Sequence, residues 1–113
     1  MATSTGTTKS ATKTVKAKKE ADLRFKEVQK AAILLKQVSD ATRLQVILML
    51  SEEEKHVGAL CESLNMSQPA VSHHLALLRH GRIIAPRRVG KNNFYSLTET
   101  GEVLAKVVKS IMD

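Results

Sequence analysis

Aromatic residues are scarce in this sequence. It has no tryptophan, one tyrosine and two phenylalanines among 113 residues, although 42% of its residues are hydrophobic. The core must therefore be built from Leu, Ile, Val and Ala, a set that suits helices packed on helices. The length leaves room for one small domain with a modest core.

Long apolar runs and paired cysteines are also missing. No apolar run approaches the roughly 20 residues that a membrane span requires, and the first residues lack the apolar segment of a signal peptide. Cys61 is the single cysteine, so the chain cannot form an internal disulfide. We therefore expect a cytoplasmic protein with no membrane partner, located at the nucleoid if it binds DNA.

Catalytic motifs are absent from the sequence as well. There is no glycine-rich phosphate loop, and Cys61 lies in no motif that pairs a nucleophile with a general base. We therefore predict that the protein is not an enzyme.

The net charge of +7 is distributed unevenly along the chain. Residues 1–19 hold five lysines and no acid. Residues 67–93 also lack acids, and their basic side chains are Arg79, Arg82, Arg87, Arg88 and Lys91. Because neither stretch alternates with large apolar residues, the charge favours a polyanionic partner over a membrane surface.

Residues 1–20 consist mainly of Thr, Ser, Ala and Lys and have almost nothing to bury. This composition predicts a disordered basic tail, followed by one folded domain over residues 21–113. The tail has two interpretations between which the sequence does not decide. It is either a solubilising segment or a flexible cationic arm that adds phosphate contacts without sequence preference.

Apolar residues recur at helical spacing on both sides of a capping site near residue 40. Residues 22–38 predict a first helix, and a second helix runs from the cap at Ser39 or Asp40 to about residue 50. The first helix has on one stripe Phe25, Val28, Ala32 and Leu35. On the second helix, the side chains expected to face the core are those of Leu44, Ile47 and Leu48. The charged residues 51–55 predict a turn.

A helix-turn-helix is predicted just past the middle of the chain. Residues 57–64 form a short helix, residues 65–66 a turn, and residues 67–80 a second helix that Gly81 ends. Ser67 caps this second helix, and Pro69 suits its first turn. Its apolar face carries Val71, Leu75 and Leu78. Its polar side carries Ser67, Gln68, Ser72 and His73.

A basic hairpin follows the helix-turn-helix. Residues 83–89 and 93–97 predict two strands, and the turn between them contains Gly90, Lys91 and Asn92. A helix-turn-helix followed by such a hairpin is a winged helix. The predicted fold is therefore mostly α with a small β-hairpin, in which four helices precede the hairpin and one follows it.

The last helix opens at Thr98 and carries a wide apolar stripe. One row contains Val103, Val107 and Ile111, and a second row beside it contains Leu104 and Val108. So much apolar surface is unusual for the final helix of a small domain. It is compatible with a homodimer, which the sequence alone does not require.

Several of these segments together resemble the ArsR/SmtB family of bacterial winged-helix repressors. The matching segments are SDATRL at residues 39–44, Val57, Leu60 and Leu64, SQPAVSHHL at residues 67–75, and residues 83–97 from Ile83-Ile84 through Gly90 to Tyr95 and Leu97. The resemblance covers about residues 22–111. The part ending in VSHHL is the most specific to this family.

The resemblance implies a homodimeric repressor that binds an inverted repeat in double-stranded DNA. In this family the first and last helices pair across a two-fold axis, which assigns to the dimer interface Phe25, Val28, Ala32, Leu35, Val103, Leu104, Val107, Val108 and Ile111. We expect residues 67–80 to enter the major groove, where Gln68, Ser72 and His73 read bases and Ser67 holds a phosphate. We expect the wing at residues 87–93 to contact phosphates or the minor groove through Arg87, Arg88, Lys91, Asn92 and Asn93.

The sequence departs from its relatives at the sites where many of them bind metal. A Cys-Val-Cys pair is replaced here by His56 and Gly58, and the metal site of the last helix keeps one carboxylate, Glu99. We therefore predict no metal site and no cofactor. Cys61 is either a small buried hydrophobe or a single-thiol sensor. The inducer, if one exists, is not given by the sequence.

A second function stays open at this stage. The same fold could serve as an architectural, nucleoid-associated protein with little sequence preference, and the lysine-rich first residues favour this reading. The polar residues at the start of the helix at residues 67–80 favour a sequence-specific regulator instead.

Overall fold

The computed structural model describes the backbone of residues 8–113 and the side chains of residues 14–113. The first seven residues of the predicted tail lie outside the described residues. By its internal contacts the chain divides between Leu34 and Leu35, whereas the sequence predicted a boundary at residue 20.

Helix α1 (Thr8–Val38) begins well before the residue at which the sequence predicted it to start. Residues 8–20 belong to this helix, although their composition predicted disorder. The reason is that Ala, Lys and Glu have high intrinsic helix propensity and that no glycine or proline interrupts residues 7–57. Low hydrophobicity argues only against burial, and the side chains of residues 14–33 are all exposed.

Helix α2 (Ala41–Glu52) begins at the N-cap Asp40, whose carboxylate accepts a hydrogen bond from the Arg43 N–H at 3.0 Å. Its buried residues are Val46, Ile47 and Leu50. The prediction was therefore right for Ile47 and wrong for Leu44 and Leu48, which are half-buried. The helix is apolar almost all round, so its periodicity did not single out one face.

Helices α3 (Val57–Leu64) and α4 (Gln68–His80) form the predicted helix-turn-helix. Asn65 ends α3 in the left-handed conformation, with φ of 52°, which asparagine tolerates better than most residues. Ser67 is the N-cap of α4, and Pro69 lies in its first turn. The prediction is confirmed for both helices and for the turn between them.

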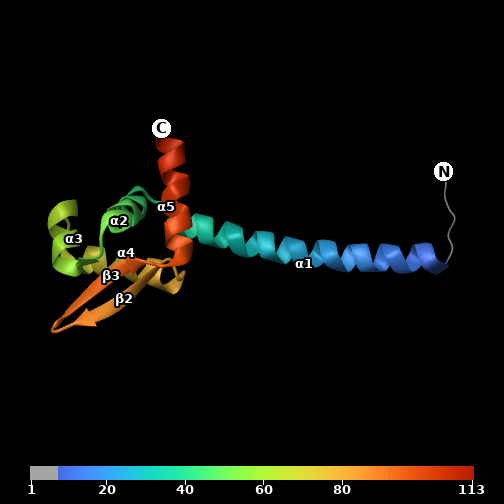
Figure 1. The fold of residues 1–113 in the computed structure, drawn as a ribbon, viewed down its shortest axis with the longest axis horizontal. Coiled ribbons are helices and arrows are strands. Elements are labelled where there is room, and N and C mark those ends of the chain that lie inside the picture. Colours follow the sequence, from blue (N-terminus) through green and yellow to red (C-terminus); the bar gives the residue numbers. More distant parts are fainter. Residues whose placement is uncertain (1–7) are drawn as a thin grey trace. The chain divides into compact units, whose positions relative to one another are not determined.

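The wing belongs to a three-stranded antiparallel sheet with the order β1-β3-β2. Strands β2 (Ile84–Val89) and β3 (Asn92–Leu97) form the predicted hairpin, joined by a two-residue turn at Gly90, with φ of 62°, and Lys91. Figure 1 shows this turn at the end of the hairpin away from α5. Strand β1 (Lys55–His56), which pairs with β3, was missed because residues 51–55 were predicted as a turn.

Helix α5 (Glu99–Met112) is tied to the end of α4 by its N-cap. The Thr98 hydroxyl donates to the Arg82 carbonyl at 2.7 Å and accepts from the Gly101 N–H at 3.2 Å. A Cβ on Gly101 would lie 2.2 Å from the Ile83 carbonyl oxygen, so only glycine fits there. This close contact fixes where α5 crosses the base of the wing.

One apolar core holds α4 in place. The predicted inward residues Val71, Leu75 and Leu78 are confirmed as buried, with the other core residues Val38, Val46, Ile47, Leu50, Leu60, Ile83, Ile84, Leu104 and Ala105. The opposite side of α4 is thereby fixed toward solvent. Among residues 8–113 no helix is long and apolar enough to cross a membrane.

Candidate nucleic-acid interface

The N-terminal end of α4 presents short polar side chains to solvent. The Ser67 hydroxyl accepts a hydrogen bond from the Ala70 N–H at 3.4 Å and so caps the helix. Gln68, Ser72 and His73 are exposed, whereas Val71 is fully buried. Burial of the apolar side therefore points the predicted base-reading side chains outward, where they can hydrogen-bond with base edges.

The start of α4 and the turn of the wing line one hollow. Gln68 shares a space of about 340 Å³, here called the tip hollow, with Lys91, Asn92 and Asn93. His56 and Gly58 at the start of α3 also line it. The fold thus brings Gln68 beside the wing residues that the sequence assigned separately to DNA binding.

His56 has a structural role at the position where relatives were expected to carry a metal-binding cysteine. Its Nδ1 accepts a hydrogen bond from the Ala59 N–H at 3.3 Å and caps α3. Its ring packs edge-on against the Phe94 ring, with the two ring centroids 5.4 Å apart. Cys61 is half-buried on the same helix. Within the described part of the chain, no three His, Cys, Asp or Glu side chains come close enough together to hold a metal ion.

The two wing arginines differ from each other in their contacts. Arg87 forms an ion pair with Glu54, and its Nε lies 3.3 Å from the Glu54 Oε2. This hydrogen bond and the charge of Arg87 lower the pKa of the Glu54 carboxyl, and the same contacts raise the pKa of Arg87. Arg88 donates from its Nε to the Gly90 carbonyl at 3.1 Å. Neither guanidinium is therefore as free as the sequence suggested, although both side chains are exposed.

Glu54 was not assigned to the site by sequence reasoning. It is 33 residues from Arg87 and follows two other glutamates, which made it resemble a solvated turn. Its contact depends on the pairing of β1 with β3, which brings residues 54–56 beside the wing.

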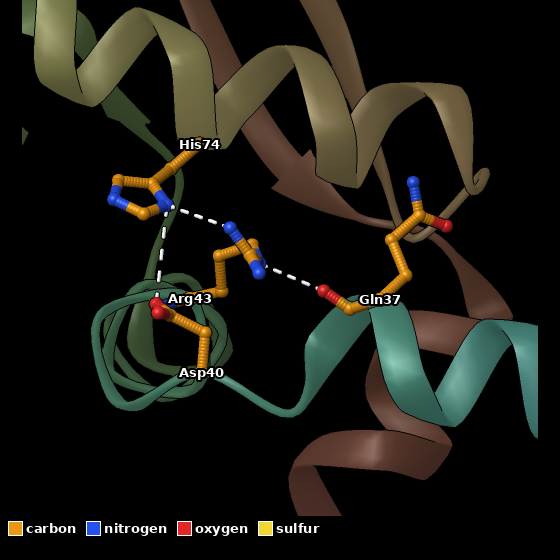
Figure 2. Close-up of polar contacts among 4 residues, drawn as sticks. All are labelled: Gln37, Asp40, Arg43 and His74. Carbon is orange, nitrogen blue, oxygen red and sulfur yellow. Dashed lines mark hydrogen bonds and ion pairs between the residues drawn. The ribbon is translucent and has the colours of Figure 1, made fainter.

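Behind the polar surface, four side chains tie α4 to the ends of α1 and α2 (Figure 2). Arg43 donates from its Nε to the Gln37 carbonyl at 2.7 Å, and its Nη1 lies 3.1 Å from the His74 Nδ1. The Asp40 Oδ2 lies 3.9 Å from the same nitrogen of His74. Gln37 in turn donates from its Nε2 to the Leu77 carbonyl at 2.7 Å.

This group, here called the Asp40 cluster, comprises Gln37, Asp40, Arg43 and His74. The Arg43 N–H lowers the pKa of the Asp40 carboxyl, and the positive charge of Arg43 lowers it further. The His74 side chain lies mostly inside, with 16% of its surface exposed. His74 accepts from Arg43 when its Nδ1 carries no proton. The cluster therefore positions α4 against the ends of α1 and α2.

Exposed apolar side chains occur on α5 and on α1. Val103, Val107 and Ile111 are exposed, with Ile111 at 78%. Leu104 is 8% exposed and packs in the core, and Val108 is half-buried, so the second of the two predicted rows mainly serves the protomer itself. On α1 the predicted stripe is exposed at all its positions: Phe25, Val28, Ala32 and Leu35.

An apolar groove runs between α2 and α5. It has a volume of about 340 Å³ and is lined mainly by Leu44, Leu48, Val108, Ile111 and Met112. The half-buried residues of α2 that the sequence predicted to face inward therefore line a surface groove.

A helix-turn-helix with an exposed polar second helix, followed by a basic antiparallel wing, defines a winged-helix DNA-binding protein. A family model described as "Bacterial regulatory protein, arsR family" matches residues 40–85. The transcriptional activator HlyU of Vibrio cholerae is 40% identical over 82 residues, which cover 73% of this chain and 75% of HlyU. The chain belongs to the ArsR family of bacterial transcriptional regulators.

Other relatives agree with this assignment. The arsenical resistance operon repressor of Escherichia coli is 46% identical over 66 residues, which cover 58% of this chain and 56% of that protein. The crystal structure of HlyU from Vibrio vulnificus matches with a TM-score of 0.73 at 33% identity, covering 83% of this chain and 99% of that chain. The crystal structure of the repressor BigR from Xylella fastidiosa matches with a TM-score of 0.69 at 35% identity, covering 83% of this chain and 91% of that chain.

Proposed function

We propose that the protein is a homodimeric, sequence-specific repressor of transcription that binds an inverted repeat in the cytoplasm. Helix α4 enters the major groove, and the wing at residues 87–93 contacts the flanking backbone or minor groove. The observation that carries this proposal is the tip hollow, where Gln68 lies beside Lys91, Asn92 and Asn93. These residues belong to a segment that contains no acid.

The chemistry of each side chain suggests its share in binding. A glutamine amide both donates and accepts, so Gln68 can pair with the N6 and N7 of adenine, while Ser72 and His73 read neighbouring bases. Ser67 and the N-terminal N–H groups of α4 hold a phosphate. Lys91 and the two wing arginines add phosphate contacts that carry no sequence information.

A homodimer is supported by the apolar stripes on α1 and α5. On each helix the exposed apolar residues recur at helical spacing, and a two-fold axis would bury these rows on both protomers. Two copies of α4 would then meet half-sites about one helical turn apart, or a multiple of it.

Selection of duplexes from a random pool tests sequence specificity. The purified protein should enrich an inverted repeat and bind it at least ~10³-fold more tightly than random duplex at the same salt concentration. Equal affinity for both would contradict the repressor and support the architectural protein. The relatives include an activator and repressors, so the sign of regulation needs its own test. A reporter gene is placed behind the selected repeat. If the protein is a repressor, its loss should raise expression of the reporter.

A further inference from the structure

A second hollow lies beside α4, on the side toward the base of the wing. This space, here called the backbone cleft, has a volume of about 530 Å³. Its polar lining consists of Ser72, Arg79, His80, Arg82 and Tyr95, and Ala76 also borders it. Arg79, His80 and Arg82 have no role in the DNA contacts described above.

The two arginines of the backbone cleft are free to take an anion. Across residues 14–113, neither the Arg79 nor the Arg82 side chain has a hydrogen-bond or ion-pair partner, and both are exposed. They differ in this from Arg87, which is paired with Glu54, and from Arg88, which is bound to the Gly90 carbonyl. No acid lines the cleft. Its unneutralised charge therefore exceeds that of the wing arginines.

The backbone at this corner is rigid. Arg82 adopts φ of 58°, its N–H donates to the Arg79 carbonyl at 2.9 Å, and its own carbonyl accepts from the Thr98 hydroxyl at 2.7 Å. A left-handed residue fixed on both sides sets the direction of its Cα–Cβ bond. The corner thus presents two arginine side chains at the end of α4, and binding there needs little further ordering of the backbone.

The position of the cleft suggests what fills it. If α4 lies in the major groove and the wing reaches the adjacent minor groove, the sugar-phosphate strand between these grooves must pass between α4 and β3. Ser72, Ala76 and Arg79 border the cleft from α4, and Tyr95 borders it from β3. Helix residues near the N-terminus contact bases in this motif, so residues near the C-terminus of α4 are left to meet the backbone.

We propose that the backbone cleft binds a phosphodiester of the DNA strand that separates the major from the minor groove, through the guanidinium groups of Arg79 and Arg82. The hydroxyl of Tyr95, which lines the cleft from β3, supplies a further donor. This inference rests on the proposed function, because it takes the placement of α4 and the wing from it. The contact of the two arginines with a phosphate does not depend on the DNA sequence, whereas the contact of Gln68 with a base does.

The test uses the full chain with the double substitution Arg79→Gln and Arg82→Gln. Binding to the selected repeat and to random duplex should weaken by the same factor, on the order of 10- to 100-fold, and the slope of log K against log salt should fall by about 1.8 per protomer. The matched control, Lys106→Gln with Lys109→Gln, removes the same charge from exposed positions on α5 and should leave the slope unchanged. Circular dichroism melting should show that both variants fold.

Neutral methylphosphonates placed one at a time in the repeat locate the contact. The wild-type protein should lose affinity at one phosphate in each half-site, between the bases read by α4 and those under the wing, and the double variant should not respond there. An unchanged salt slope in the double variant, or a loss confined to the selected repeat, overturns the backbone cleft alone. Failure of the wild-type protein to prefer any duplex overturns the proposed function instead.

Discussion

At the scale of single residues, a substitution at Gln68 tests whether this side chain reads bases or only positions the protein. Replacing Gln68 by Ala should cost about 1 to 3 kcal/mol of binding free energy on the selected repeat and little on random duplex, because the lost amide pairs only with the correct base. Fluorescence anisotropy on both duplexes at one salt concentration measures this difference. Equal losses on the two duplexes would make Gln68 a positioning contact.

Glu54 sets how much of the charge of Arg87 is available on the wing. Substitution of Glu54 by Gln removes the ion pair and a negative charge beside the proposed DNA-binding surface. Affinity for all duplexes should rise several-fold, and the slope of log K against log salt should steepen by about 0.9 per protomer. Glu52→Gln removes the same charge from an exposed residue nearby and serves as the control. Weaker binding by the Glu54 variant would mean that the ion pair holds Arg87 in its binding position.

At the scale of helices and strands, the accuracy of the sequence prediction followed the strength of the local signals. Helix α4 was predicted within one residue because Ser67, Pro69 and Gly81 mark its ends by side-chain or backbone chemistry. Strand β1 has two residues and exists only through its pairing with β3, so no periodicity could indicate it. The start of α1 was placed too late because weak burial was interpreted as disorder.

The same distinction applies to the candidate site. The exposed polar residues of α4 could be predicted, because burial of Val71, Leu75 and Leu78 on one face leaves the polar side chains on the opposite face, toward solvent. The Glu54–Arg87 pair and the two hollows join residues that are distant in sequence, and the backbone cleft depends on the left-handed corner at Arg82. No pattern along the chain contains that information.

The Asp40 cluster makes a prediction that concerns several helices at once. Asp40→Ala should lower the free energy of unfolding by about 1 kcal/mol through loss of the cap of α2, whereas Asp40→Asn, which still caps but carries no charge, should lower it by less. The folded-state pKa of Asp40 lies below its ordinary value of 3.8, so the contribution of the carboxylate is complete above that pH and is lost as the pH falls through the lowered pKa. Urea unfolding at several pH values measures the difference in the free energy of unfolding between the wild-type protein and the Asp40→Ala variant. A difference that stays constant into strong acid would contradict this account.

At the scale of the whole molecule, binding to an inverted repeat requires two copies of α4, and the exposed row on α5 is the surface to perturb. Val107→Glu places a charge in the proposed interface, where its desolvation costs several kcal/mol. At micromolar concentration the variant should therefore be a monomer, whereas the wild-type protein should be a dimer. Sedimentation equilibrium measures the association state. Lys109→Gln makes the same change of charge in a separate groove beside Ser51 and should leave the dimer intact.

DNA binding by these variants shows what the dimer contributes. The monomeric Val107→Glu variant should lose at least ~10²-fold in affinity for the full repeat, because its two half-sites are no longer bound by linked copies of α4. Its affinity for a single half-site should equal that of the wild-type protomer, since no residue of the tip hollow or the backbone cleft is altered. A wild-type protein that is monomeric while bound to the repeat would contradict the homodimer. A Val107→Glu variant that remains dimeric would place the interface elsewhere than on α5.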